Sequence, residues 1–267
     1  MLSIDGVHIE KDLGLHLLES SNEPILPSTR DNVVSIPGKH GAYAFKAYMS
    51  EKTFFQEVLI PTQATLFDVQ NIIRKITPLI LDQYGNPKEV ELKWDYDPDK
   101  YYRGVFSGYV SIDRIHRAGK FYLPFTAYDP YAYSVVYADE VTWGSEVLTF
   151  ESSYELGHTG TDGITKIIAP TTLNAFLDGY AVKPIFEISG SADNLTVTNG
   201  EQSFSLPSFN GDWVIDCERY TVTKNGTNVF SEVSLREFWL NKGSNFIVIG
   251  GFNLDIKIRM KFRDRYL

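Results

Sequence analysis

Residues 89–113 read EVELKWDYDPDKYYRGVFSGYVSID, and residues 121–127 continue the pattern as FYLPFTA. Apolar and polar side chains alternate over 89–94, 101–112 and 121–127. Alternation with period two is typical of strands that bury one face. These segments therefore predict β-strands through the centre of the N-terminal half.

On the N-terminal side of this region, one segment favours a helix. Thr65 is a suitable N-cap with Asp68 three residues later, and apolar residues recur every three to four positions over 65–82. Pro78 should kink or end this helix. The C-terminal half is again strand-like over 185–188, 213–216, 220–223 and 254–260, with turns predicted at Asn199-Gly200, Asn210-Gly211 and Asn225-Gly226. The predicted class is mainly β with one α-helix.

The distribution of charge supports two domains. The chain of 267 residues has a net charge of −9, of which residues 1–134 contribute −3 and residues 135–256 contribute −10. The last eleven residues, 257–267, contribute +4. We therefore expect an N-terminal domain over 1–134 and a C-terminal β-sandwich over 135–256. The basic segment 257–267 is a candidate to complete the first domain.

The composition excludes several classes of protein. The acidic charge gives no counterion-release drive for binding nucleic acid, and disfavours docking on an anionic membrane. The single cysteine, Cys217, rules out an intrachain disulfide. The N-terminal residues show neither the basic nor the apolar region of a secretory signal peptide. Aromatic residues reach 14%, a composition that favours strands and interfaces.

Catalytic motifs are lacking. No nucleophile elbow is found, and the five histidines lie in polar, loop-like contexts, where a solvated surface role is expected. Cys217 lies between Asp216 and Glu218, whose charges would raise the pKa of its thiol, so a buried structural cysteine is the better interpretation. We expect no enzymatic activity.

Metal and cofactor sites are not indicated either. Asp95, Asp97 and Asp99 resemble the start of a calcium loop, but Lys100 replaces the required glycine and Phe106 stands at the twelfth position. A solvated acidic loop is the expected structure. Phosphate-binding loops and dinucleotide fingerprints are absent, so no cofactor is predicted.

Sugar binding is a weaker alternative. It would use exposed aromatic side chains as stacking platforms, although a β-sandwich also places such residues in its core. The candidates in the C-terminal half are Trp143, Tyr180, Trp213 and Trp239. Hydrolysis of a glycan would need two carboxylates across the sugar, and no pair of acids stands out.

Several motifs, taken in order, resemble the distal tail (Dit) proteins of siphophages that infect Gram-positive bacteria. IPGKHGAY at 36–43 contains Gly38 and Gly41, which permit a positive φ at a turn. The helix at 65–82 and the strands at 90–114 follow. KFYLPFTAYDPYAYS at 120–134 closes the domain, and FNGDWVIDCERYTVTKNG at 209–226 resembles a strand–turn–strand of the family's C-terminal sandwich. The closing motif residues are Asp129, Pro130, Tyr131 and Tyr133.

The resemblance implies a structural role in the virion. Family members form a homohexameric ring at the phage tail tip, with N-terminal β-sandwich-like domains in the ring and galectin-like or carbohydrate-module-like sandwiches projecting from it. The implied partners are the tail tube protein, the tail-tip hub or tail-associated lysin, and receptor-binding or baseplate proteins. Assembly would occur in the host cytoplasm.

Three functional interpretations follow. The first is the tail-tip ring, whose acidic wall would repel the DNA that passes through it. The second is a carbohydrate-binding module that recognises cell-wall glycans, and the third is a wall-degrading hydrolase. A ring requires a heterologous interface repeated until it closes.

Overall fold

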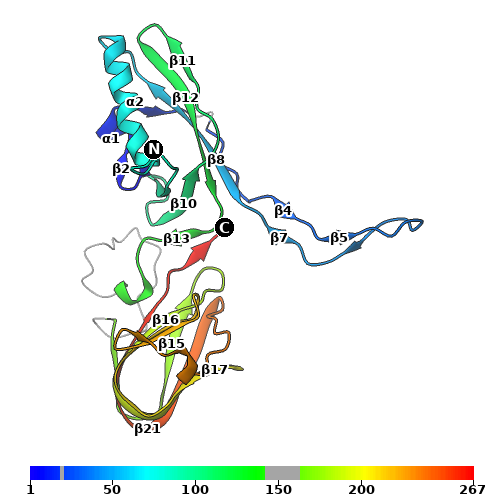
Figure 1. Ribbon diagram of the computed structural model, residues 1–267, viewed down its shortest axis with the longest axis vertical. Helices are drawn as coiled ribbons and strands as arrows, with labels where there is room; N and C mark the ends of the chain where they lie inside the picture. The colour runs from blue at the N-terminus through cyan, green and yellow to red at the C-terminus, as the bar shows by residue number, and fades with distance from the viewer. Residues whose placement is uncertain (19–20, 142–162) are drawn as a thin grey trace. The chain divides into compact units, whose positions relative to one another are not determined.

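The computed structural model describes residues 1–18, 21–141 and 163–267. The chain divides into two compact units, one formed by residues 1–132 with Leu267 and the other by residues 133–266. Each unit has its own hydrophobic core. The predicted class, mainly β, is confirmed (Figure 1).

The N-terminal unit is built on an antiparallel sheet whose strands lie in the order β2-β1-β9-β10-β12-β8-β3, with β11 paired to β12. Strand β9 covers Glu89–Trp94, and β12 pairs along the whole of β8. Alternate side chains of these strands enter the core, as the period-two pattern predicts. The strand bounds are β1 Leu2–Ile4, β2 Val7–His8, β3 His16–Leu17, β8 Lys52–Ile60, β10 Lys100–Phe106, β11 Ile112–Ile115 and β12 Ala118–Ala127.

Helix α2, Leu66–Ile80, is the predicted helix. Thr65 Oγ1 accepts the Asp68 N–H at 3.2 Å, and Asp68 Oδ2 accepts the Thr65 N–H at 2.9 Å. This reciprocal capping box satisfies two backbone donors at the helix start. Pro78 lies in the last turn of the helix, which continues only two residues beyond it. The buried helix residues Val69, Ile76 and Ile80 belong to the core of the unit.

A second helix, α1 (Ile9–Leu13), was not predicted. It has five residues, too few to show a helical period in the sequence. His8 caps its first turn, and Gly14 ends it with a φ of +67°. Glycine adopts this left-handed conformation without steric cost.

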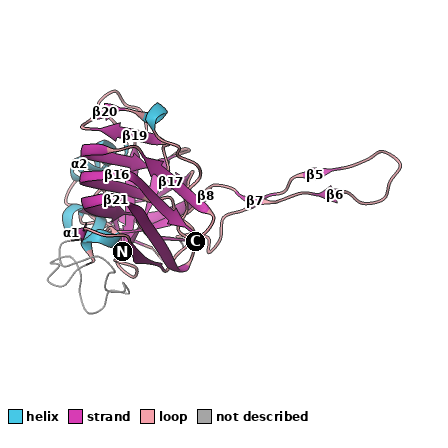
Figure 2. Cartoon of the chain, turned by 90° about the horizontal axis from the view of Figure 1, so that it is seen from below, coloured by secondary structure: helices cyan, strands magenta, loops and turns pink. Residues whose placement is uncertain are grey.

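The C-terminal unit is a sheet that folds over on itself, in the order β14-β21-β16-β18-β19-β20 with β15 paired to β21 and β17 to β16. The long strands β16 (Ile185–Asn199) and β21 (Gly243–Lys261) lie side by side (Figure 2). Their register shifts between Ser191 and Thr196, where the sheet folds over. Each of the two strands therefore contributes to both halves of the folded sheet. The other strands are β14 Thr165–Ile167, β15 Thr171–Leu177, β17 Gln202–Leu206, β18 Phe209–Asp216, β19 Thr221–Lys224 and β20 Thr227–Asn228.

The two halves enclose a single core, to which β21 contributes both Ile247 and Ile258. Residues 257–261 are the end of β21 and pair with β14 and β16, which places them in the second unit. The sequence had allowed them to complete the first unit. The remaining short elements of this unit are the 3₁₀ helices Ala138–Glu140 and Phe230–Glu232, with β22 at Arg265–Tyr266; β13 covers Ala132–Ser134.

One of the predicted turns is wrong. Asn199-Gly200 connects β16 to β17 and Asn225-Gly226 connects β19 to β20, but Asn210-Gly211 lies inside β18. Gly211 faces Gly190 on β16, and a Cβ at Gly211 would lie 2.9 Å from the Asn225 amide oxygen. The glycine is therefore needed for a close approach within the sheet.

Candidate assembly interface

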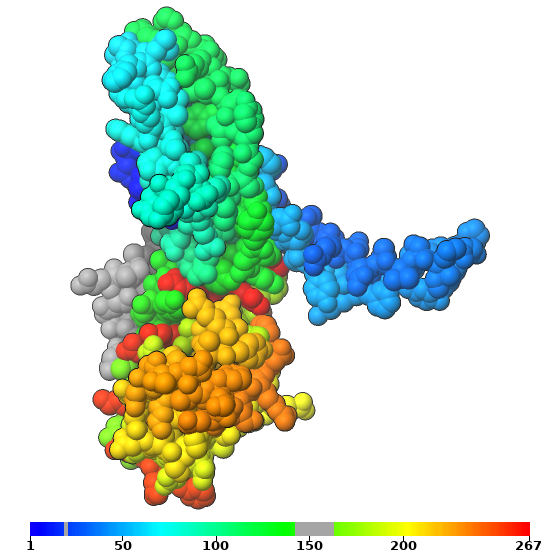
Figure 3. All heavy atoms as spheres, in the orientation of Figure 1, coloured from blue at the N-terminus to red at the C-terminus, as the bar shows by residue number. Residues whose placement is uncertain are grey.

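A two-stranded arm, residues 24–50, extends away from the body of the N-terminal unit (Figures 1 and 3). It carries two short antiparallel ladders. The first pairs β4 (Thr29–Arg30) with β7 (Tyr48–Met49), and the second pairs β5 (Val33–Val34) with β6 (Tyr43–Ala44). Gly38 and Gly41 lie at the tip with φ values of +81° and +83°.

The root of the arm is fastened to the sheet by polar side chains. Lys52 follows the arm, and its Nζ donates to the Tyr102 hydroxyl at 2.9 Å and to the Ile25 carbonyl at 3.3 Å. Glu23 precedes the arm and accepts from Gln56 Nε2 at 3.1 Å and from the Tyr96 hydroxyl. Both ends of the arm are thereby fixed at the sheet.

Burial governs the ionisation of this root. It lowers the pKa of the Lys52 ammonium, and Glu23 opposes the shift. Burial also raises the pKa of the Tyr102 phenol, and Asp97 and Glu23 add to that increase. Tyr102 therefore keeps its proton near neutral pH, where it accepts the hydrogen bond from Lys52.

Beyond the root, the arm exposes apolar side chains on both strands. Phe45 is 61% exposed, and Ile25 is 87% exposed. An isolated two-stranded ribbon is at best marginally stable in water. The arm therefore has the properties of a segment that is covered by another molecule. The exposed apolar residues are Ile25, Leu26, Val33, Val34, Ile36, Tyr43, Phe45, Tyr48 and Met49.

The arm is also basic, in a chain that is acidic. It contains Arg30, Lys39 and Lys46 against the single acid Asp31, which gives a net charge of +2 with neutral His40. The Lys39 ammonium lies 3.5 Å from the centre of the Tyr43 ring. The arm thus combines aromatic and cationic groups, which are complementary to an acidic surface.

The sequence did not reveal this arm. Its glycine turn at 36–43 was expected, but the turn was expected to lead into a strand of the domain. The available signal was a change in composition after Pro37: residues 42–49, AYAFKAYM, are mostly aromatic and small. Whether this segment packs in the domain core or projects as an arm depends on tertiary contacts.

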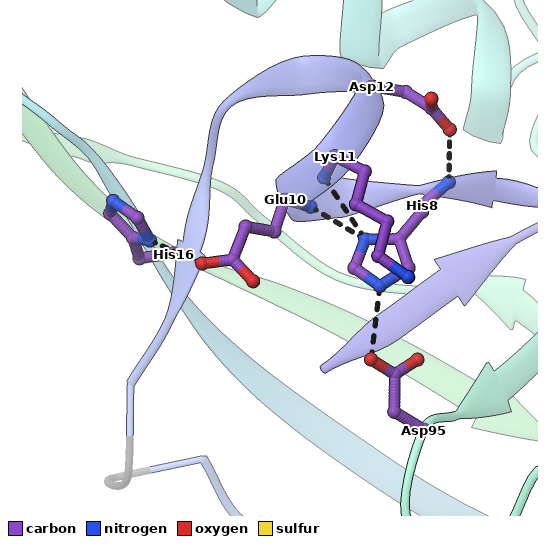
Figure 4. Close-up of polar contacts among 6 residues, drawn as sticks. All are labelled: His8, Glu10, Lys11, Asp12, His16 and Asp95. Atoms are coloured by element: carbon purple, nitrogen blue, oxygen red, sulfur yellow. Dashed lines mark hydrogen bonds and ion pairs between the residues drawn. The ribbon is translucent and has the colours of Figure 1, made fainter.

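The polar cluster around His8 is the second candidate site (Figure 4). His8 is only 9% exposed, so its expected role as a solvated surface residue is wrong. Its Nδ1 accepts the backbone N–H groups of Glu10 at 3.2 Å and Lys11 at 3.1 Å, and its Nε2 lies 3.0 Å from Asp95 Oδ2. Because Nδ1 accepts, the proton is on Nε2 and is donated to Asp95.

A histidine–carboxylate pair is a common element of general-base catalysis, but here the base is unavailable. Both ring nitrogens of His8 are already engaged, one by helix α1 and the other by Asp95. No nitrogen is left to accept a proton from a nucleophile. The pair joins α1 to the end of β9 and is structural.

Replacing His8 tests that interpretation. His8→Ala removes the cap of α1 and the bond to Asp95, and we expect the free energy of unfolding of the N-terminal unit to fall by about 1–2 kcal/mol. His8→Asn keeps a capping oxygen and should recover part of this loss. Hydrogen exchange at the Glu10 and Lys11 amides measures the cap directly. Equal exchange in the alanine variant and the parent protein would contradict the assignment.

The other histidines that the structure describes do not form a site. His16 Nδ1 lies 3.0 Å from Glu10 Oε1 with its side chain 49% exposed, and His40 and His116 are exposed. His158 lies outside the described residues. Among the described residues, no cluster of His, Cys, Asp and Glu could hold a metal ion. Of the acidic run 95–99, Asp95 contacts His8, and Asp97 pairs with Lys100 at 3.2 Å.

Cys217 is buried, as predicted, and is 1% exposed. It directly follows β18, which ends at Asp216. Burial raises the pKa of its thiol to about 12, and Asp216 adds to the increase. The thiol is therefore neutral at physiological pH.

This predicts an inert cysteine. At pH 8 the folded protein should react with a thiol reagent such as DTNB at least ~100-fold more slowly than the urea-unfolded chain, because only the thiolate attacks and the side chain is inaccessible. The time course of absorbance, recorded without urea and in urea that unfolds the chain, measures the ratio of the two reaction rates. Rapid labelling in the folded state would show that the thiol is accessible.

The aromatic residues expected to stack on a sugar do not share one environment. Trp213 is 0% exposed and packs edge-on against Phe209 with ring centres 5.8 Å apart, so its assignment as a stacking platform is wrong. Tyr180 is 50% exposed. Trp239 is partly buried, and the Lys183 ammonium lies 4.6 Å from its ring. Trp143 lies outside the described residues.

The closing motif of the first domain lies between two strands. Asp129 and Pro130 follow the end of β12 at Ala127, and Tyr131 and Tyr133 flank the start of β13. Pro130 lacks an N–H, which accords with the interruption of the strand there. Their expected role in the family motif stays a prediction.

Comparison with known families bears on the N-terminal unit. Residues 10–127 match the family model described as phage tail protein RIFT-related domain. This segment belongs to that family. The phage-tail domain runs from α1 to the end of β12, so it includes the arm and its root.

One solved structure shares its fold with this chain over the full length. The crystal structure of SPP1 Dit (gp 19.1), described as a paradigm of hub adsorption apparatus in Gram-positive infecting phages, aligns with a TM-score of 0.70 and 15% identity, covering 100% of this chain and 98% of that chain. A chain of the phage p2 baseplate in its activated conformation aligns with a TM-score of 0.44 and 11% identity, covering 96% and 94%. No curated protein matches the sequence. Among the described residues, no helix is both long and apolar enough to span a membrane.

Proposed function

We propose that this protein is a structural component of the phage tail tip that assembles with copies of itself into a closed, hexameric ring. In the virion the ring joins the distal tail tube to the tip hub and leaves a central channel for DNA. The C-terminal unit docks proteins of the adsorption apparatus. The protein acts by its shape and its surfaces, and transforms no substrate.

The observation that carries the proposal is the exposed apolar arm of the phage-tail domain. Burying three of its aromatic side chains, Tyr43, Phe45 and Tyr48, would contribute roughly 1.5–3 kcal/mol each. This apolar burial opposes the loss of translational and rotational entropy on association. The two ends of the arm are fixed at the sheet, which limits the entropy lost when the arm binds.

A second copy of this chain is the partner that charge complementarity favours. The arm has a net charge of +2 and the whole chain a net charge of −9, so the remainder of each copy is strongly acidic. The arm and its binding surface are different parts of the molecule. Such a heterologous contact repeats from copy to copy and closes into a ring when the rotation allows it.

Native mass spectrometry of the full-length protein tests the proposal. The expected spectrum shows six copies at micromolar concentration and low ionic strength, and negative-stain images show rings. Association should weaken at high salt, because opposite charges at the interface are screened. A stable monomer at all concentrations, alone and with the neighbouring tail proteins, would contradict a ring.

A further inference from the structure

The C-terminal unit contains a trough on the outer face of its central strands. The trough has a volume of about 270 Å³ and is lined from β16, β18 and β21. It follows β16, where Ser189 is small and the residues on the two flanking strands are long. The charged and hydroxyl residues that line it are Glu187, Ser189, Asp212, Lys257 and Arg259.

The two walls of the trough have opposite charges. Lys257 and Arg259 stand on β21, and Asp212 stands on β18, with β16 between them. Ser189 pairs with Lys257 on one side and with Asp212 on the other, so the three residues form one row across the sheet. Paired residues of neighbouring antiparallel strands point to the same face.

Lys166 of β14 continues this row beyond Lys257 and is paired with Asp255 at 3.3 Å, whereas Lys257 and Asp212 have no partner among the described residues. The next row is already neutralised, since Glu187 pairs with Lys261 at 2.8 Å and Arg259 lies 3.7 Å from Asp139. The Lys257 ammonium and the Asp212 carboxylate form neither an ion pair nor a side-chain hydrogen bond with the residues that the structure describes. They are separated by the width of β16, and they are not paired with each other.

The spacing of the walls defines the ligand. Two strand spacings place the Cα atoms of Lys257 and Asp212 about 9.5 Å apart, and strand side chains stand roughly perpendicular to the sheet. A charge-assisted hydrogen bond takes up about 2.8 Å at each wall. The ligand then has an anionic and a cationic group about 4 Å apart, which is the separation within a single amino acid or an aminoethyl phosphate.

We propose that this trough binds a compact zwitterion, with its anion on Lys257 and its ammonium on Asp212. The Ser189 hydroxyl lies between the two charges and hydrogen-bonds the ligand. Ile164 and Val214 provide apolar walls for a small hydrocarbon part. A singly charged ligand would leave one wall charge unpaired and bind more weakly.

Isothermal titration of the full-length protein tests this site with defined probes. Glycine and phosphoethanolamine represent the carboxylate and phosphate forms of the zwitterion, and acetate and methylammonium each carry one of its charges. We expect at least one zwitterion to bind with a millimolar or lower Kd, and both single-charge probes to bind at least tenfold more weakly. Which zwitterion binds tighter identifies the anion. The backbone amide signals of the ¹⁵N-labelled protein should shift at Ser189, Asp212 and Lys257, which line the trough.

Two variants separate the site from nonspecific charge. Lys257→Gln and Asp212→Asn should each weaken zwitterion binding at least tenfold, whereas Lys242→Gln and Glu201→Gln, exposed and outside the trough, should leave the Kd unchanged within twofold. Far-ultraviolet circular dichroism checks that all four variants are folded. No heat and no amide shift in the trough at 50 mM of either zwitterion, or equal binding by trough and control variants, would overturn the proposal. Neither result depends on whether the protein forms rings.

Discussion

Replacing the arm with a tight turn is expected to leave the protein monomeric at concentrations where the full chain forms rings. The Ser50 N–H donates to the Ser28 carbonyl at 2.8 Å, so the two strands are already paired at the root. Residues 29–49 can therefore be replaced by Asn-Gly, which closes a two-residue hairpin. The root contacts of Glu23 and Lys52 remain, and the core of the unit contains no residue of the arm.

The expected loss is large because the arm presents a continuous run of exposed apolar side chains on both of its strands. Three aromatic side chains at roughly 1.5–3 kcal/mol each exceed 4 kcal/mol, and each 1.4 kcal/mol is a factor of ten in affinity. We expect the dissociation constant to rise by at least about 1000-fold, measured by sedimentation velocity across a concentration series. Rings that persist without the arm would assign the interface to another surface.

Single substitutions locate the effect within the arm. Phe45→Ser removes a 61% exposed side chain whose backbone N–H is bonded to the Asn32 carbonyl, so the ladder is retained. Its matched control is Tyr84→Ser, which removes an 81% exposed ring from the turn after α2. Phe45→Ser should weaken association tenfold or more, and Tyr84→Ser should not.

The strands and the long helix could be predicted because their signals are local. Strand β9 covers the residues predicted, 89–94, since Val90, Leu92 and Trp94 alternate with polar residues and all three enter the core. Helix α2 has both a capping box and a run of apolar residues at helical spacing. In each case one segment contains the information that determines its structure.

The arm and the His8 cluster could not be predicted, because each depends on contacts between distant segments. His8 contacts Asp95, which is 87 residues away in the sequence, and its ring is buried in the folded unit. The same limit applies to Trp213. Its sequence neighbours are compatible with either face of a strand, and only the fold places its ring in the core. The charged trough was missed for the same reason, as its residues are contributed by three strands.

The Gly190→Ala variant should unfold the C-terminal unit far more easily than the parent protein. Gly190 has a φ of +117°, and an added Cβ would lie 2.2 Å from the Asp255 carbonyl oxygen. The backbone strain costs about 1–3 kcal/mol. The contact is with the backbone of the central partner strand, so β16 and β21 would have to separate at the bend that joins the two halves of the sheet. We expect a total loss of about 4 kcal/mol.

Gly200→Ala is the matched control, because it adds the same methyl group at a positive φ without a contact. Gly200 has a φ of +61° and no atom within 4 Å of the added Cβ, so about 1 kcal/mol is expected. Urea unfolding followed by tryptophan fluorescence reports on the C-terminal unit through Trp143, Trp213 and Trp239, and the signal of Trp94 in the N-terminal unit should be the same in both variants. The difference between the two variants isolates the close approach of β16 to β21 from the strain of the positive φ. Equal losses in the two variants would mean that the strands yield at the bend, and that the long strands β16 and β21 are not rigidly paired there.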